Sequence, residues 1–265
     1  MSMSRGDAKA KARGDTRPIA RDTGMMVAGN HTATTPEKVV DTRAAKELDY
    51  LVVIDFECTC DKSDSQLDVM EIIEFPAILV NLKDGLIEAE FHTYVKPVIN
   101  PVLTPFCMEL TGISQTQVNE GLPLKAALEE FNRWYTGVRQ PGKAYAVASD
   151  GPTDFSRFLH QNCKARSLHM PSMFEHWVDL RKAFRNHWYK NIRGTGVKNV
   201  TFSMSRLDPA QASGIEKMLT YFGLNFEGKP HCGLDDTRNI ARIALAMVKK
   251  GVVLKVNGHL GDYDC

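Results

Sequence analysis

The chain has 265 residues, of which 43% are hydrophobic and 25% charged, the composition of an ordinary globular protein. Its 33 Lys and Arg residues nearly balance its 32 Asp and Glu residues, so any surface that attracts nucleic acid must be local. No apolar run approaches the roughly 18–20 residues that span a bilayer, and the N-terminal residues lack the apolar core of a secretory signal. Membrane and secreted classes are therefore disfavoured.

The first 47 residues differ from the rest of the chain. They contain few large apolar residues and no sustained periodicity, which is typical of a disordered segment. We expect a disordered leader over 1–47, one folded domain over 48–257 and a short tail over 258–265. The six cysteines lack paired zinc spacing, which favours reduced thiols and an intracellular protein. Cytoplasm or nucleus is expected, or the mitochondrion if the leader is a targeting segment.

The apolar pattern predicts nine main elements. In chain order they are strands at 50–56, 75–82 and 88–97, a helix at 123–135, a strand at 143–149, and helices at 153–166, 173–189, 210–224 and 234–251. The turn at 83–85 predicts a hairpin, Thr153 is expected to cap its helix, and Gly223 and Gly251 are expected to end the last two helices. This order predicts an α/β fold with a mixed sheet and helices packed on it, in one domain.

The stretch LVVIDFECTC, residues 51–60, places two acids at the end of a predicted buried strand. Asp55 and Glu57 are two residues apart, so their side chains point to the same face of the strand. Two like charges so close repel each other or share a proton, and burial adds several kcal/mol to their cost. A divalent cation removes this conflict, and Mg²⁺ prefers carboxylate oxygens. The pair therefore predicts a metal site.

Further candidates lie near the starts of two predicted helices. Asp154 follows the fourth strand, Asp236 lies in the first turn of the last helix, and His231 precedes it by five residues. Taken singly, each acid is explained by the helix dipole, and His231 by an ordinary surface position. Several carboxylates that converge on two metal ions are, however, the arrangement for in-line hydrolysis of a phosphodiester.

The order of these residues resembles that of a known enzyme family. D-x-E on the first strand, an Asp in mid-chain and H-x4-D near the end are similar to the DEDDh, or DnaQ-like, 3′–5′ exonucleases. The resemblance covers about residues 48–257 and implies a ribonuclease-H-like mixed β-sheet flanked by helices, as a single exonuclease domain. It narrows to the Eri-type branch, which trims histone messenger RNA, small RNA and ribosomal RNA. The stretches that carry it are VIDFECTC, EIIEFPAILVN, FCMELTGISQTQV, SDGPTDFSRFL and GKPHCGLDDTRNIARIA.

The resemblance also implies a role for each matched residue. The implied ligands of two Mg²⁺ ions, for which Mn²⁺ can substitute, are Asp55, Glu57, Asp154 and Asp236. His231 is the implied general base for the attacking water, so His231 and Glu57 are the expected catalytic residues; a general base contributes about 10²–10⁴ in rate. The family pattern does not need Asp150 or Asp235, and we interpret them as a turn residue and a helix-start acid.

Residues 180–207 contain no Asp or Glu, whereas basic and aromatic side chains are interleaved there. This pattern suits a groove that follows a nucleic-acid backbone. The alternative is a solvated basic helix face with its aromatics in the core, and for Phe184 and Trp188 both remain open. The resemblance places FCMELTGI beside the 3′-terminal nucleotides. The expected nucleic-acid contacts are Met108, Leu110, Thr111, Arg181, Arg185 and Lys190.

The expected function is a metal-dependent 3′–5′ exoribonuclease in RNA processing or turnover. It would act on single-stranded or 3′-overhanging RNA and release nucleoside 5′-monophosphates, with no membrane partner. One alternative is a DNA exonuclease of the same family, because the same residues serve both sugars and only contacts to the 2′-OH distinguish them. A second is an RNA-binding adaptor that does not cleave, which predicts an incomplete acid set. The flanking residues favour RNA.

Overall fold

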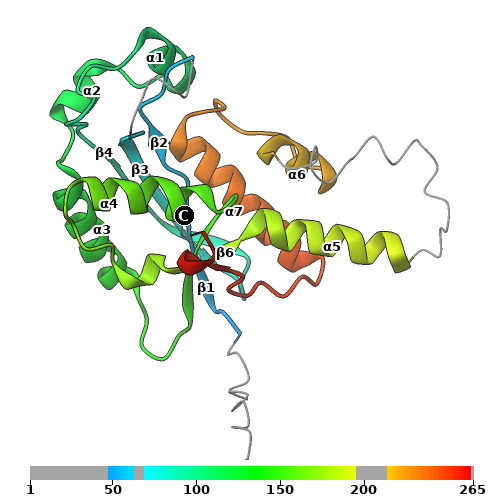
Figure 1. Ribbon diagram of the computed structural model, residues 1–265. Helices are drawn as coiled ribbons and strands as arrows, with labels where there is room; N and C mark the ends of the chain where they lie inside the picture. Colours follow the sequence, from blue (N-terminus) through cyan, green and yellow to red (C-terminus); the bar gives the residue numbers. More distant parts are fainter. Residues whose placement is uncertain (1–46, 63–68, 195–213, 264–265) are drawn as a thin grey trace, which may run out of the picture. The chain divides into compact units, whose positions relative to one another are not determined.

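The described part of the chain folds around a mixed β-sheet with helices on both faces (Figure 1). It comes from a computed structural model that describes residues 47–62, 69–194 and 214–263. Apart from Glu47, the predicted leader lies outside these residues. The strands are β1 (Tyr50–Ile54), β2 (Glu57–Cys58), β3 (Ile72–Asn81), β4 (Leu86–Tyr94), β5 (Tyr145–Ser149), β6 (His176–Asp179) and β7 (Gly258–His259). The α-helices are α1 (Pro105–Thr111), α2 (Gln115–Glu120), α3 (Leu124–Val138), α4 (His160–Ala165), α5 (Leu180–Gly194), α6 (Ile215–Tyr221) and α7 (Gly233–Lys249).

The sheet combines parallel and antiparallel pairs. Its strand order among the described residues is β4-β3-β1-β5-β6-β7, and β2 pairs with β3 beyond the end of β1. Strands β1, β5 and β6 are parallel, whereas β3 and β7 run against their neighbours. The carboxyl ends of β1, β5 and β6 therefore meet at one edge of the sheet, where open α/β sheets bind ligands.

Strand β1 is apolar along its whole length because both of its faces are buried. All five of its residues are buried, because helices cover both faces of the sheet. Val52 and Ile54 belong to the apolar cluster on the α3 face, and Leu51 and Val53 to the cluster formed with α5, α6 and α7. Alternate residues of one strand thus serve two separate cores, and the strand is fixed from both sides.

One predicted helix is wrong over its first part. Residues 173–189 contain strand β6 before α5 begins at Leu180. Trp177 and Val178 are fully buried and lie opposite Val147 and Ala148 of β5. A four-residue segment with two apolar residues next to a helix cannot be assigned to strand or helix from its periodicity alone. Here the parallel pairing with β5 makes it a strand.

Smaller differences concern the ends of elements. Thr153, predicted to be a helix cap, has helical dihedral angles and no capping hydrogen bond; it precedes a π-helical segment, Asp154–Leu159, that continues into α4. The sheet also extends past residue 257, because β7 pairs with β6. Gly223 and Gly251 follow α6 and α7 with φ of +72° and +78°, as expected for glycines that end helices. No helix among the described residues is long and apolar enough to cross a membrane.

Candidate active site

The chain between β1 and β2 carries the first two acids. β1 ends at Ile54, and the strand resumes as β2 at Glu57. Phe56 lies between them, buried edge-on against Phe75 with ring centroids 4.8 Å apart. Its backbone N–H donates to Oδ1 of Asp154 at 2.9 Å. The buried phenylalanine thus fixes the strand end while the acids on either side of it point the other way.

Four carboxylates, which we call the acid cluster, meet at this point. Its members are Asp55, Glu57, Asp154 and Asp236. One oxygen from each of Asp55, Glu57 and Asp236 lies within 4.8 Å of the others, a spacing that a single metal ion can bridge. Asp154 is buried beside them and is the neighbouring charge that acts most strongly on Asp55. Asp55, Glu57 and Asp236 line a cavity of about 420 Å³ together with His231.

The electrostatics of the acid cluster favour a bound cation or bound protons. Burial, together with the neighbouring acids, raises the pKa of Glu57 to about 9. Burial raises the pKa values of Asp154 and Asp236 to about 7, against hydrogen bonds from Phe56 and His231 that lower them. The pKa of Asp55 is raised well above its usual value by burial and then by Asp154. Hard oxygen donors in such an arrangement fit a divalent metal ion.

The predicted general base lies on an exposed segment that we call the histidine loop, residues 227–232. His231 is exposed, has φ of +63°, and its backbone N–H donates to Oδ2 of Asp236 at 2.8 Å. Left-handed backbone is uncommon for a residue other than glycine, so this hydrogen bond helps to hold the conformation. The loop is therefore connected directly to a member of the acid cluster.

Asp235 fastens the same loop. Its Oδ2 accepts the backbone N–H of Lys229 at 3.0 Å, and its Oδ1 pairs with Arg238. A Cβ added at Gly228 would lie 2.3 Å from Asp235 Oδ2, so only glycine fits there. Asp235 lies in the first turn of α7, as predicted, but it also positions the histidine loop.

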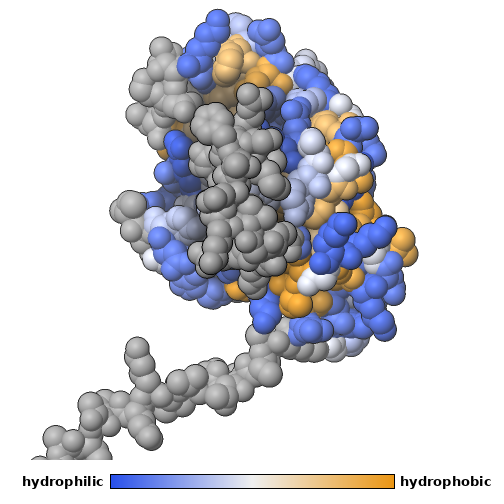
Figure 2. Space-filling view, turned by 90° about the vertical axis from the view of Figure 1, so that its right-hand side faces the viewer, coloured by the Kyte–Doolittle hydropathy of each residue, from blue (hydrophilic) through white to orange (hydrophobic). Residues whose placement is uncertain are grey.

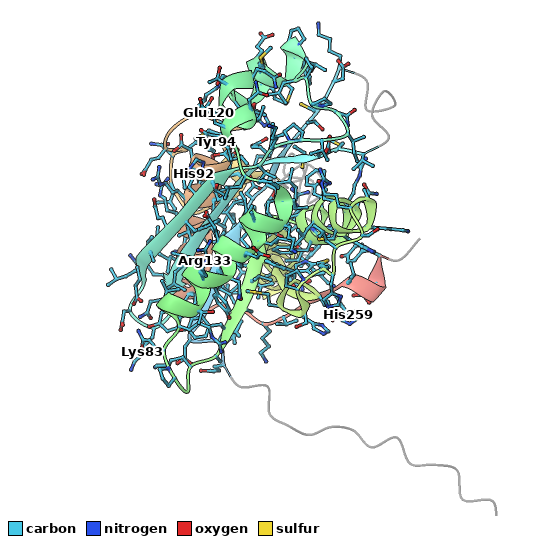
Figure 3. All side chains as sticks on the ribbon, turned by 90° about the vertical axis from the view of Figure 1, so that its left-hand side faces the viewer. Lys83, His92, Tyr94, Glu120, Arg133 and His259 are labelled. Atoms are coloured by element: carbon cyan, nitrogen blue, oxygen red, sulfur yellow. The ribbon has the colours of Figure 1, made fainter. Side chains whose placement is uncertain are left out.

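Glu74 is a buried acid that the sequence analysis did not single out. It lies opposite Glu57 in the β2–β3 pairing, and its Oε2 accepts the backbone N–H of Gly233 at 3.0 Å. Its Oε1 is 2.7 Å from Nε2 of His92, which lies near Tyr94 on β4 (Figure 3). An acid inside the apolar stretch EIIEFP was the available signal. Glu74 therefore joins the start of α7 to the sheet beside the acid cluster.

Asp150 is more than the turn residue that was predicted. It follows β5 directly, is 8% exposed, and lines the same cavity as Asp55 and Glu57. The guanidinium of Arg181, a predicted nucleic-acid contact, forms a half-buried ion pair with its carboxylate. The parallel strand β1 ends beside β5, which explains why two strand ends deliver acids to one cavity.

The other predicted nucleic-acid contacts lie on α1 and α5, and the described ones do not line this cavity. Met108 and Leu110 pack against the apolar cluster around α1, and Thr111 is buried with its hydroxyl donating to the carbonyl of Cys107. None of these α1 residues lines the cavity described above. Arg185 lies on α5, and the side chain of Lys190 lies outside the described residues. Their roles stay predictions.

Two aromatic residues of α5, Phe184 and Trp188, pack in the core, whereas Tyr189 is exposed. Phe184 is 2% exposed, and Trp188 packs against the same cluster, so the core alternative holds for both. The face that carries α5, α6 and α7 shows hydrophilic residues interspersed with hydrophobic ones where it is coloured (Figure 2). Phe184 and Trp188 are therefore not available to stack on bases, and among the three aromatic residues named here only Tyr189 is exposed.

The sheet order, the parallel strand ends and the acid cluster define a ribonuclease-H-like nuclease domain. The sequence model of the family described as Exonuclease matches residues 52–244, and the chain belongs to that family. Within it, the chain is a member of the Eri-type branch of the DEDDh exonucleases. This family implies divalent metal ions, with which the oxygen donors of the acid cluster agree.

Curated relatives agree with this assignment. The chain is 34% identical to ERI1 exoribonuclease 2 of Xenopus laevis, over 92% of this chain and 35% of the relative. It is 36% identical to 3′-5′ exoribonuclease 1 of Homo sapiens, over 79% and 55%. Against 3′-5′ exonuclease Snipper of Drosophila melanogaster the identity is 32%, over 86% and 81%. The chain thus spans about a third of the length of the first relative and just over half of the length of the second.

Solved structures agree as well. The nuclease domain of 3′hExo, a DEDDh family member bound to rAMP, superposes with a TM-score of 0.70 at 34% identity, over 82% of this chain and 100% of that one. A structure described as 3′-end specific recognition of histone mRNA stem-loop by 3′-exonuclease gives the same TM-score at 33% identity, over 80% and 87%.

Proposed function

We propose that this chain is a 3′–5′ exoribonuclease that hydrolyses RNA from its 3′ end and releases nucleoside 5′-monophosphates. The observation that carries the proposal is the convergence of carboxylate oxygens of Asp55, Glu57 and Asp236 within 4.8 Å, in a cavity that His231 also lines. A complete set of acids argues against a non-cleaving adaptor, which has no need to keep such costly groups together.

The acid cluster is proposed to hold two Mg²⁺ ions, with Mn²⁺ as a substitute. Bound divalent ions supply an activated water and neutralise charge on the phosphate. The protein fixes the ligands: β1 and β2 hold Asp55 and Glu57, and the Phe56 N–H orients Asp154. Burial and the neighbouring acids raise the pKa of Glu57 to about 9 and that of Asp55 well above its usual value, so both carboxylates gain from a cation that replaces their protons.

His231 is proposed to take the proton from the attacking water. The water oxygen forms a new bond to phosphorus and the bond from phosphorus to the 3′ oxygen breaks. That oxygen takes a proton from solvent, so the shortened RNA keeps a 3′-OH. His231 lies on the rim of the cavity, exposed on the histidine loop, so its imidazole can reach a water above the acids. A positioned general base must lie within hydrogen-bond reach of that water.

RNA is proposed as the substrate in preference to DNA. Relatives at 34% and 36% identity are named exoribonucleases, and the structure at 33% identity is described with a histone mRNA stem-loop. The proposed contacts are Met108, Leu110, Thr111, Arg181, Arg185 and Lys190, of which the first five do not line the cavity of the acid cluster. The proposed compartment is the cytoplasm or the nucleus, with the mitochondrion as the alternative. The five described cysteines are free, which agrees with a reducing environment.

A side-by-side degradation assay tests this proposal. RNA and DNA of identical sequence, single-stranded and as stem-loops, are incubated with the full chain and Mg²⁺. We expect the RNA to shorten from its 3′ end faster than the DNA. Faster loss of DNA would assign the chain to DNA, and two intact substrates would support the adaptor.

A further inference from the structure

Three parallel strands end at the edge of the sheet that carries the site, and each delivers an aspartate there. Asp55 follows β1, Asp150 follows β5, and Asp179 is the last residue of β6. The strands are in register, with Val53 opposite Ala148 and β5 pairing with β6 up to Asp179. These aspartates therefore form a row, of which the family pattern uses only the first.

Asp150 and Asp179 are both buried but differ in what holds them. Asp179 caps α5, because its Oδ1 accepts the backbone N–H of Lys182 at 2.7 Å, and it does not line the acid cavity. Asp150 is held by Arg181, whose guanidinium binds Oδ2 and whose backbone N–H donates to the Asp150 carbonyl at 2.8 Å. Oδ1 of Asp150 has no hydrogen-bond partner among the described residues. A buried acceptor left in this way normally has a water or ligand partner.

Nε of Arg181 also lacks a partner among the described residues, so it is the cavity beside Asp150 that points to a partner for Oδ1. The Asp150 side chain lines the cavity together with Asp55, Glu57 and Asp236, and its charge acts on the acids around it. It does not belong to the group whose oxygens lie within 4.8 Å of one another. Asp154 also lies outside this group of three, but the family pattern makes Asp154 a ligand and gives Asp150 no such role. Asp150 thus lines the cavity of the three acids without an assigned ligand role.

We propose that Asp150 is an outer carboxylate of the metal centre, whose Oδ1 accepts a hydrogen bond from a water bound to the divalent cation. The inference rests on the proposed metal-dependent function and adds a residue to its site. Arg181 binds the second oxygen, so the carboxylate has one orientation, and it offsets one negative charge of a crowded acid group. Groups that orient metal-bound ligands in this way typically change metal affinity by about 10–100-fold when removed.

Binding of Mn²⁺ to the full chain, measured by titration calorimetry, tests the proposal without substrate. Asp150→Asn keeps the size of the side chain and removes its charge; we expect it to weaken Mn²⁺ binding by about 10–100-fold. Asp179→Asn is the matched control, because it changes a buried aspartate at the end of the next strand. We expect the control to lower the Tm and to bind Mn²⁺ like the wild type.

A conservative variant separates positioning from folding. Asp150→Glu retains the carboxylate and is expected to bind Mn²⁺ more tightly than Asp150→Asn. Equal Mn²⁺ affinity in Asp150→Asn and the wild type would overturn the inference. Equal weakening in both Asp150 variants, with the same loss of Tm in EDTA, would also overturn it, because Asp150 would then act only as the structural partner of Arg181. If the wild type itself binds no Mn²⁺, the proposed metal-dependent function fails first.

Discussion

The acid cluster and the histidine loop belong to one site, but the chain holds them in different ways. Asp154 and Asp236 are 5% exposed, and the cluster rests on strand ends with helices on both faces. His231 is exposed, and its loop depends on hydrogen bonds to the neighbouring acids Asp235 and Asp236. The comparison teaches that the proposed metal ligands are fixed by the fold, whereas the proposed base is fixed by a few local contacts.

The largest effect is expected in the acid cluster. Asp55→Asn removes a charge from a buried site and should lower exonuclease activity by about 10³-fold or more, because residues that act as a unit fail together. It should also weaken Mn²⁺ binding in calorimetry. Glu130→Gln on α3, whose carboxylate pairs only with Arg133 among the described ion pairs, is the control and should keep both properties. An active Asp55→Asn protein would show that the cluster is not the catalytic centre.

Replacing the base should separate the two regions. His231→Ala should lower the rate by about 10²–10⁴-fold and leave Mn²⁺ affinity unchanged, because the backbone N–H of His231, which the variant keeps, makes the hydrogen bond to Asp236. His259→Ala on β7 serves as the control (Figure 3). The measurements are single-turnover rates and calorimetry. Loss of metal binding in His231→Ala would mean that the histidine itself is a ligand.

The loop contacts should have an intermediate effect. Gly228 has φ of +88°, and an added Cβ would collide with Asp235, so Gly228→Ala should displace the histidine loop. A displacement of about 1 Å can cost about 10²-fold in rate. Gly85→Ala is the matched control, since it has φ of +71° but open space around the added Cβ. If both variants have wild-type rates at equal Tm, the loop does not position the base.

The smallest effect concerns stability and pH. The pKa of Glu57 is raised to about 9 and those of Asp154 and Asp236 to about 7, so the metal-free folded state binds more protons than the unfolded state from about pH 4 to 9. Its stability should therefore fall as pH rises through this window. Divalent ions replace those protons, so the Tm difference between Mg²⁺ and EDTA should grow with pH by a few degrees. A difference independent of pH would contradict the raised pKa values.

The sequence predicted the parts of this site that depend on short-range pattern. The apolar run before Asp55, the spacing to Glu57 and the helix that starts near Asp236 are all visible locally, and the structure places them as expected. Resemblance to a family then connected positions that are far apart in the chain. That connection supplied Asp154, which no periodic pattern distinguishes from a capping residue.

Other features depend on which strands are neighbours and could not be read from the sequence. The residues of β6 were predicted to be helical, because only their pairing with β5 distinguishes a strand from a helix at this position. Asp150 was interpreted as a turn residue because the family pattern does not need it; its place in the cavity depends on the pairing of β1 with β5. Glu74 was overlooked, since its partners His92 and Gly233 come from β4 and α7.

One measurement tests the central claim most directly. RNA labelled at its 5′ end is incubated with the wild type or Asp55→Asn, in Mg²⁺ or in EDTA, and the products are separated by length. With wild type and Mg²⁺ we predict a ladder that shortens progressively from the 3′ end, with nucleoside 5′-monophosphates released. Asp55→Asn and EDTA should each leave the RNA intact. Cleavage that persists in EDTA, or wild-type protein that leaves the RNA uncut in Mg²⁺, would contradict the account.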